Sequence, residues 1–266
     1  MATKKGGPLL SNQRLTKTVL SGGKHSKPRV VRSGSKRFLF KRLSVGKALS
    51  LEEAKTLSQA MVVYNLALKK AGVNVATLHM SHPIRDQRGG YFVGSLEEFI
   101  TRKTAQSEIA HASSKIALAL FGATFAEVYK AVKQNNTKAK LMIDPKLSNF
   151  SVDKQGRVVY IDFYTPKLAT STGQLTPYVE KLHSKSRAEL TKRYGDRQAV
   201  IHLLLAYAIS TRPRLRKPMI NHVATFLRNV GENELARSII KACEITTSPK
   251  VILTSDYGTL LSTVNK

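Results

Sequence analysis

The sequence predicts an α+β fold in which a small N-terminal antiparallel sheet and one helix precede a mainly helical C-terminal part. In the first hundred residues, short apolar and β-branched runs alternate with Gly-rich or polar breaks, as is typical of strands and turns. From residue 104 onward, apolar residues recur at helical spacing, apart from one hairpin-like stretch near residues 150–162. A chain of 266 residues with 42% apolar content can bury the core that such a fold requires.

The first 49 residues differ in composition from the rest, because they hold thirteen Lys or Arg and no Asp or Glu. Residues 1–14 lack apolar periodicity, and we expect them to form a flexible basic tail. The net charge is +27, of which +14 remains when those thirteen are left out. Such a charge predicts a polyanionic partner, either RNA or a ribonucleoprotein or a phosphorylated substrate. An anionic membrane surface, a tail that serves solubility and an organelle-targeting signal are the alternatives.

The sheet and its helix are predicted to occupy residues 15–99. The helix is expected over residues 50–71, because Ser50 is a good N-cap and Glu53 completes a capping box. Apolar residues then recur every three or four positions until Gly72 ends the pattern. The predicted strands lie at 15–20, 29–32, 37–43, 73–79 and 90–93.

Residues 100–266 are predicted to be helical, and the longest helix, over residues 104–134, leads directly to a polar loop. The apolar runs at 116–126 and 200–209 are too short to span a bilayer, so no transmembrane segment is expected. The single cysteine, Cys243, excludes an internal disulfide and is consistent with the reducing cytoplasm. The remaining predicted helices lie at 187–193, 197–211, 218–230 and 232–246.

Residues 141–166, which read LMIDPKLSNFSVDKQGRVVYIDFYTP, carry the strongest functional pattern. Asp144 is followed five positions later by Asn149, and a predicted hairpin then leads to Asp162. The polar break at residues 153–156 ends in Gly and is typical of a tight turn between two strands. Asn149 comes before the first strand and Asp162 ends the second, so both lie at the end of the hairpin opposite the turn. We therefore expect them to lie close together. Phosphoryl transfer needs a carboxylate that orients the acceptor hydroxyl and oxygen ligands that hold Mg²⁺.

This segment resembles the catalytic loop and the metal-binding segment of protein kinases, and its spacing is similar to that of aminoglycoside and choline phosphotransferases. The resemblance implies that Asp144 is the catalytic aspartate and that Lys146 reaches the transferred phosphate. It further implies that Asn149 and Asp162 bind Mg²⁺. An ordinary surface hairpin, whose polar residues only flank the strands, is the alternative.

Three departures from the kinase pattern favour a small constitutive kinase, or a degenerate one, over a regulated protein kinase. Met142 and Ile143 stand where the pattern has His-Arg, so the backbone of the loop must be supported differently. Tyr164 replaces the glycine that follows Phe163, which restricts the backbone there. No A-P-E motif follows.

The resemblance also implies a two-lobed protein-kinase-like fold, with an N-lobe at residues 15–99 and a helical C-lobe at residues 100–266. Residues 38–41 have the form of the kinase V-A-I-K segment, three apolar residues followed by lysine. Lys41 would then contact the α- and β-phosphates of ATP, and Glu53 would steady it. An edge-strand lysine and a glutamate that only caps its helix are the alternatives.

Two functions are compatible with these patterns. The leading one is an ATP- and Mg²⁺-dependent phosphotransferase that acts on an unidentified hydroxyl acceptor. The alternative is a non-catalytic protein, kinase-like or of another α+β fold, that binds RNA or a ribonucleoprotein through its basic surface. A structure can discriminate between them, because a phosphotransferase requires Asp144, Asn149 and Asp162 to converge with Lys41 facing them.

Overall fold

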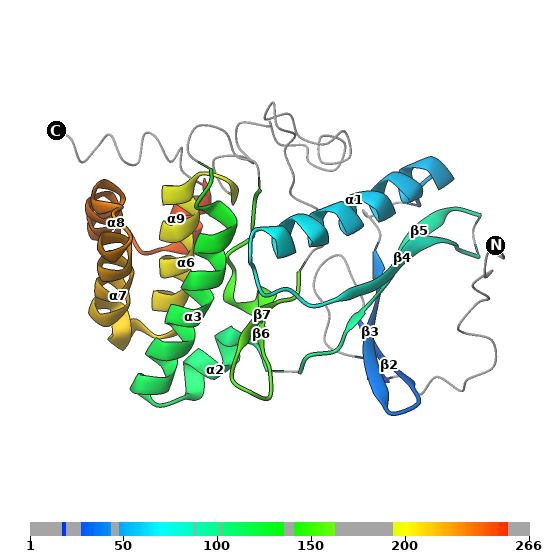
Figure 1. Cartoon of the computed structure of the whole chain (residues 1–266), viewed down its shortest axis with the longest axis horizontal. Coiled ribbons are helices and arrows are strands. Elements are labelled where there is room, and N and C mark those ends of the chain that lie inside the picture. The colour runs from blue at the N-terminus through cyan, green and yellow to red at the C-terminus, as the bar shows by residue number, and fades with distance from the viewer. Residues whose placement is uncertain are drawn as a thin grey trace, which may run out of the picture.

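The computed structural model confirms the α+β class, with an antiparallel sheet and one helix beside a group of helices (Figure 1). The basic tail predicted at residues 1–14 and the helix predicted at 187–193 lie outside the described residues. The structure describes residues 18–19, 28–43, 48–87, 89–101, 103–135, 141–162 and 194–254.

The five strands of the sheet pair in the order β1-β2-β3-β5-β4, and every pair is antiparallel. The segment predicted as a strand at residues 73–79 is mostly a loop, and the strand begins instead at Leu78. Pro83 lies inside this strand, which is possible because β4 is an edge strand. The strands are β1 (Thr18–Val19), β2 (Arg29–Ser33), β3 (Lys36–Leu43), β4 (Leu78–Arg85) and β5 (Tyr91–Glu98).

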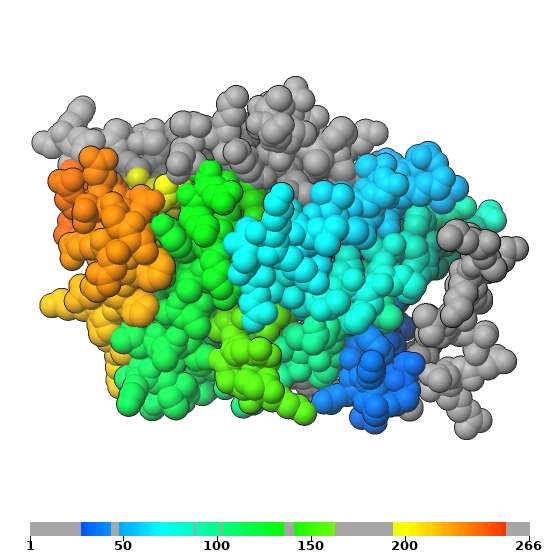
Figure 2. Space-filling view, in the orientation of Figure 1, coloured from blue at the N-terminus to red at the C-terminus, as the bar shows by residue number. Residues whose placement is uncertain are grey.

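Helix α1 (Leu51–Lys70) packs on one face of the sheet, where Leu57 and Met61 join a buried cluster with Leu43 and Val93. The predicted capping box closes its N-terminus, so the start of the helix follows from local sequence alone. The helix forms part of the surface shown in Figure 2. Four of its large apolar side chains remain exposed, those of Leu51, Val62, Val63 and Leu66.

The pattern predicted as one helix over residues 104–134 forms two helices. Ala112 is extended, and Ser113 then caps a new helix by accepting a hydrogen bond from the Ile116 N–H. The first helix therefore ends at Ala112, and the Ser113 side chain begins the next. The helices after the sheet are α2 (Ala105–His111), α3 (Ser114–Val132), α6 (Arg197–Thr211), α7 (Arg216–Asn229), α8 (Asn233–Ile245) and α9 (Pro249–Thr254).

A two-stranded hairpin, β6 (Phe150–Val152) with β7 (Val158–Tyr160), lies between the sheet and the helices, as the sequence predicts (Figure 1). The main core joins these parts, because it contains Tyr64 of α1, Phe121 and Phe125 of α3, and Tyr160 of β7. Among the described residues, none of the helices combines the length and the apolar character needed to cross a membrane.

Candidate functional site

The hairpin brings Asn149 next to the segment that carries Asp162. Phe150 pairs with Tyr160, and the ladder extends one residue further, because the Ile161 N–H donates to the Asn149 carbonyl over 2.9 Å. Asn149 ends a 3₁₀ turn, η1 (Leu147–Asn149), and Asp162 follows Ile161 directly. The two residues therefore lie on neighbouring chain segments at the open end of the hairpin.

The loop that holds Asp144 is anchored on both sides by buried apolar residues, Ile143 and Leu147. Within it, the Asn149 amide nitrogen lies 3.4 Å from the Asp144 carbonyl, and Asp144 Oδ1 lies 3.3 Å from the Lys146 backbone nitrogen. Asp144 and Asn149 are half-buried, whereas Lys146 is exposed. The loop thus holds a carboxylate and an amide at a partly open surface, with a lysine beside them.

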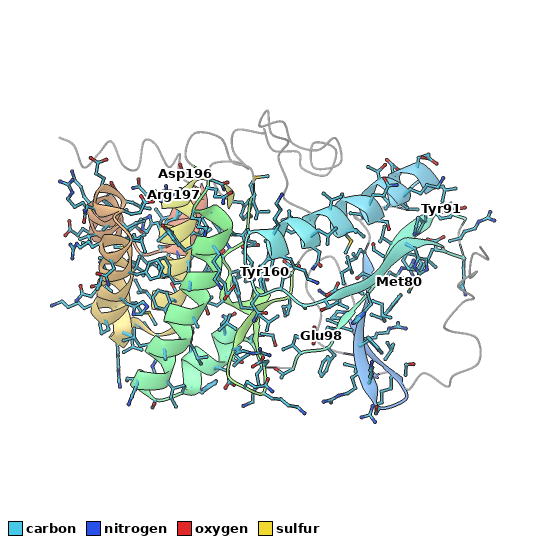
Figure 3. The ribbon with its side chains drawn as sticks, in the orientation of Figure 1. Met80, Tyr91, Glu98, Tyr160, Asp196 and Arg197 are labelled. Atoms are coloured by element: carbon cyan, nitrogen blue, oxygen red, sulfur yellow. The ribbon has the colours of Figure 1, made fainter. Side chains whose placement is uncertain are left out.

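Two buried tyrosines report on the electrostatics of this region. Burial raises the pKa of Tyr64 and of Tyr160 far above the usual value, and the charges of Asp144 and Asp162 raise both further. Coulomb interactions weaken with distance, so both carboxylates lie near this tyrosine pair. Figure 3 shows Tyr160 between the sheet and the helices. Asp144 and Asp162 therefore lie in the neighbourhood of these tyrosines.

The Tyr64 hydroxyl connects α1 to the loop by donating to the Met142 carbonyl over 2.7 Å. Met142 stands where the kinase pattern has His, and this bond supplies backbone support of a different kind at that point. The Tyr160 hydroxyl is also buried and interacts with the Tyr64 hydroxyl.

Lys41 links the sheet to the Asp162 segment. Its side chain is 9% exposed, and its ammonium nitrogen lies 2.8 Å from the Ile161 carbonyl oxygen and 2.8 Å from Glu97 Oε2. The Lys41–Glu97 contact is an ion pair by distance, although its angle does not meet hydrogen-bond geometry at Oε2. A lysine of β3 thus reaches the backbone directly before Asp162.

Glu97 is a site residue that sequence reasoning missed. Its carboxylate is buried on β5 and also accepts a hydrogen bond from the Ser95 hydroxyl over 2.9 Å. Burial raises the pKa of Glu97, and the ammonium of Lys41 opposes this effect. Because Lys41 pairs with Ser95 in the ladder, alternation places Glu97 on the same face. That register was not predictable from the sequence.

Glu53 lies in the first turn of α1, where its side chain caps the helix. Its carboxylate accepts a hydrogen bond from the Ser50 backbone N–H over 2.8 Å and so closes the capping box of α1. A carboxylate of the sheet, that of Glu97, contacts Lys41. The steadying role that the sequence analysis gave to Glu53 stays a prediction.

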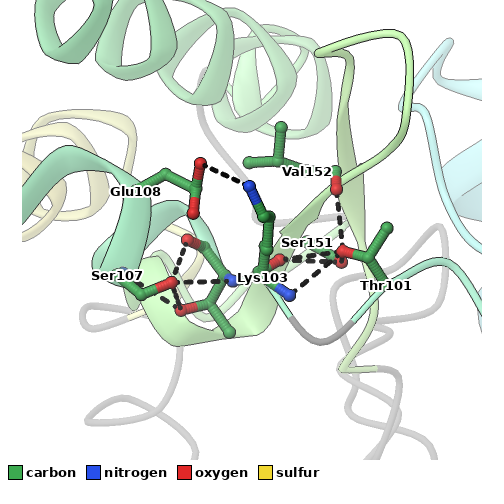
Figure 4. A network of polar contacts seen from close by, with 7 residues as sticks. Thr101, Lys103, Ser107, Glu108, Ser151 and Val152 are labelled. Atoms are coloured by element: carbon green, nitrogen blue, oxygen red, sulfur yellow. Dashed lines mark hydrogen bonds and ion pairs between the residues drawn. The ribbon is translucent and has the colours of Figure 1, made fainter. Parts of the chain in front are cut away.

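A second connection ties the sheet to the hairpin through the segment between β5 and α2 (Figure 4). The Thr101 hydroxyl donates to the Val152 carbonyl over 2.8 Å, and the Ser151 hydroxyl donates to the Lys103 carbonyl over 3.0 Å. Lys103 also forms an ion pair with Glu108 of α2 at 3.5 Å. The hairpin is thus joined to β3 through Ile161 at its open end, and to the segment between β5 and α2 through strand β6.

The donor set at the open end of the hairpin is compatible with Mg²⁺. Asn149 and Asp162 offer an amide oxygen and a carboxylate, and Mg²⁺ is commonly held by one or two such ligands together with substrate phosphates and water. Among the described residues, no three His, Cys, Asp or Glu side chains gather as a metal site of their own. Within the described residues, Asn149 and Asp162 are therefore the two candidate Mg²⁺ ligands at this end of the hairpin.

The chain matches no known protein-family model and none of the curated proteins with which it was compared.

Proposed function

We propose that the chain is an ATP- and Mg²⁺-dependent phosphotransferase with the two-lobed arrangement of protein-kinase-like enzymes. The observation that carries the proposal is the meeting of Lys41, Asn149 and Asp162 around Ile161. Lys41 contacts the Ile161 carbonyl, Asn149 bonds to the Ile161 N–H, and Asp162 comes next in the chain. The charge of Asp144 acts on the same tyrosines as that of Asp162, which supports a shared location.

In this proposal each residue has one task. Asp144 orients the acceptor hydroxyl and accepts its proton, while Lys146 lies beside the transferred phosphate. Asn149 and Asp162 hold Mg²⁺, which when bound neutralises phosphate charge. Lys41 contributes a positive charge for the α- and β-phosphates and is positioned by Glu97.

The test is nucleotide binding measured with and without Mg²⁺ in the wild type and in Asp162→Asn. The variant should bind Mg·ATP at least about tenfold more weakly, a loss of ~1.4 kcal/mol, while Mg²⁺-free binding stays the same. Asp153→Asn is the matched control, because Asp153 lies at the turn of the same hairpin. Equal Mg·ATP affinity in wild type and Asp162→Asn would refute the metal assignment.

One contact favours a second candidate, a non-catalytic protein that binds a polyanion. The Lys41 ammonium is engaged by Glu97 and by the Ile161 carbonyl, and a phosphate would have to compete with both. A protein of this kind would bind RNA through its basic surface and would show no Mg²⁺-dependent nucleotide affinity. The same titration therefore separates the two candidates.

A further inference from the structure

Two surface pockets meet on helix α6. The first, with a volume of about 560 Å³, lies between the start of α2 and the C-terminal half of α6, and the second, of about 400 Å³, lies beyond it toward the start of α7. Ser210 lines both of these shallow pockets, and we call the two together the α6 groove. Each volume is within the range of small-molecule sites, on the order of 300–1,000 Å³.

The lining of the α6 groove is polar but almost uncharged. Among the lining residues in the described part of the chain there is no aspartate or glutamate, and Arg216, at the far end, supplies a positive charge. The second pocket adds the hydroxyls of Thr247 and Ser248 near that arginine. Polar side chains in the first pocket are those of Thr104, Gln106, Ser107, Tyr207, Ser210 and Thr211.

The walls of the groove are fixed by hydrogen bonds. The Arg212 guanidinium holds the C-terminus of α2 against α6 by donating to the carbonyls of Ile109 and Ala112. Arg216 donates to the Cys243 carbonyl over 2.8 Å, which anchors the far end to α8. A groove held in this way can offer its hydroxyls to a ligand without a large ordering cost.

The groove lies beside the proposed reaction site. The η1 turn that ends in Asn149 packs against both α2 and α6, the two helices that form the first pocket. Tyr207 lines that pocket, and its pKa is raised to about 12, mainly by burial and further by the charge of Asp144. The near end of the groove is therefore close to the carboxylate that would orient an acceptor.

We propose that the α6 groove binds the acceptor, and that the acceptor is a small polyhydroxylated molecule that is neutral or anionic. Hydroxyl side chains exchange hydrogen bonds with sugar-like hydroxyls, and the Arg216 guanidinium suits a phosphate or carboxylate on the ligand. A cationic ligand would find no carboxylate among the described residues that line this groove. The role as acceptor rests on the proposed function, whereas binding in the groove does not.

A cysteine at the point where the pockets meet tests the proposal without nucleotide. Ser210 is exposed, and the native Cys243 is buried with its pKa raised to about 12, so Ser210→Cys gives a protein with one reactive thiol. Its alkylation rate is measured with glucose, glucose 6-phosphate or glucosamine, which share one ring and differ in charge. A mildly acidic buffer keeps the glucosamine amine protonated.

Glucose 6-phosphate should slow alkylation several-fold in a saturable manner, glucose should slow it less, and glucosamine should not slow it. Thr225→Cys, an exposed position on α7, should show no protection by any of the three. Adding Arg216→Gln to Ser210→Cys should remove the advantage of the phosphate over the neutral sugar.

Absence of saturable protection by glucose and glucose 6-phosphate, or stronger protection by glucosamine, would overturn the inference. Equal protection at Thr225→Cys would overturn it as well, because the effect would then not belong to the groove. Mg·ATP binding is measured separately, so a groove that fails this test while Mg·ATP binds refutes only the acceptor site. A groove that passes while Mg·ATP does not bind leaves a polyol-binding site without the proposed catalysis.

Discussion

Lys41 and Glu97 form a buried ion pair between β3 and β5, and the Lys41 ammonium also contacts the backbone directly before Asp162. Lys41 was predictable, because three apolar residues followed by lysine form a recognisable strand. Glu97 was not, since its partnership depends on the pairing of β3 with β5, two strands separated by α1 and β4. Local sequence identifies a charged residue, but its partner is set by a register that the chain reaches only on folding.

Replacing Glu97 with Gln should change how stability depends on pH. Burial raises the pKa of Glu97 above its ordinary value of 4.5, so the folded protein holds this proton more tightly than the unfolded chain does. The wild type should therefore lose stability as the pH rises from 4.5 toward the raised pKa, by up to ~1.4 kcal/mol per pH unit.

In Glu97→Gln the free energy of unfolding should not fall in this way between pH 4.5 and the raised pKa. Urea unfolding at a series of pH values measures this dependence. Glu98→Gln, at the neighbouring exposed position of β5, is the control and should keep the slope of the wild type. Identical slopes in wild type and Glu97→Gln would show that the carboxyl is not perturbed as described.

Asp144→Ala should separate binding from catalysis. Asp144 is assigned to the acceptor hydroxyl, so ATP affinity should remain within about twofold of the wild type, while turnover with an accepted substrate should fall by roughly a thousandfold, or ~4 kcal/mol. Initial rates and nucleotide titration on the same preparation measure both. A variant that keeps more than about a tenth of the rate, a loss below ~1.4 kcal/mol, would exclude this role.

Among the elements, helix α1 and the β6–β7 hairpin were predictable because their signals are local. Ser50 with Glu53 marks a helix start, and the turn at Asp153 closes through bonds to its own next few residues. The strand at Leu78–Arg85 was misplaced, since Pro83 looks like a breaker until β4 is known to be an edge. The bounds of β4 therefore depend on its place at the edge of the sheet, which cannot be read from the local sequence.

The capping box of α1 predicts that loss of its N-cap side chain lowers the stability of the protein. Ser50→Ala removes the side-chain oxygen that accepts the Glu53 N–H and should lower the free energy of unfolding by about 0.5–2 kcal/mol. Thr56→Ala, at an exposed position of the same helix, should have no cost, because alanine has the higher helix propensity. Urea unfolding of both variants measures the difference, and equal stabilities would argue against the cap.

For the whole molecule, the net charge of +27 predicts an interaction governed by salt. Residues 1–27 contain six Lys or Arg and precede β2. Replacing these six with Gln should flatten the slope of log K against log salt for single-stranded RNA by up to about 4, at ~0.7 for each lost phosphate contact. A melting curve controls for folding, and an unchanged slope would assign any polyanion site to the rest of the chain.

The bonds around Tyr160 have a consequence for amide hydrogen exchange. The Tyr160 N–H donates to the Asn74 carbonyl, and the Ala76 N–H donates to the Tyr160 carbonyl. These two backbone hydrogen bonds join strand β7 of the hairpin to the segment between α1 and β4. These two protons can exchange only when the hairpin separates from residues 74–76 or the whole protein unfolds. Their exchange rates therefore measure how rarely this contact opens, before any ligand for the site is known.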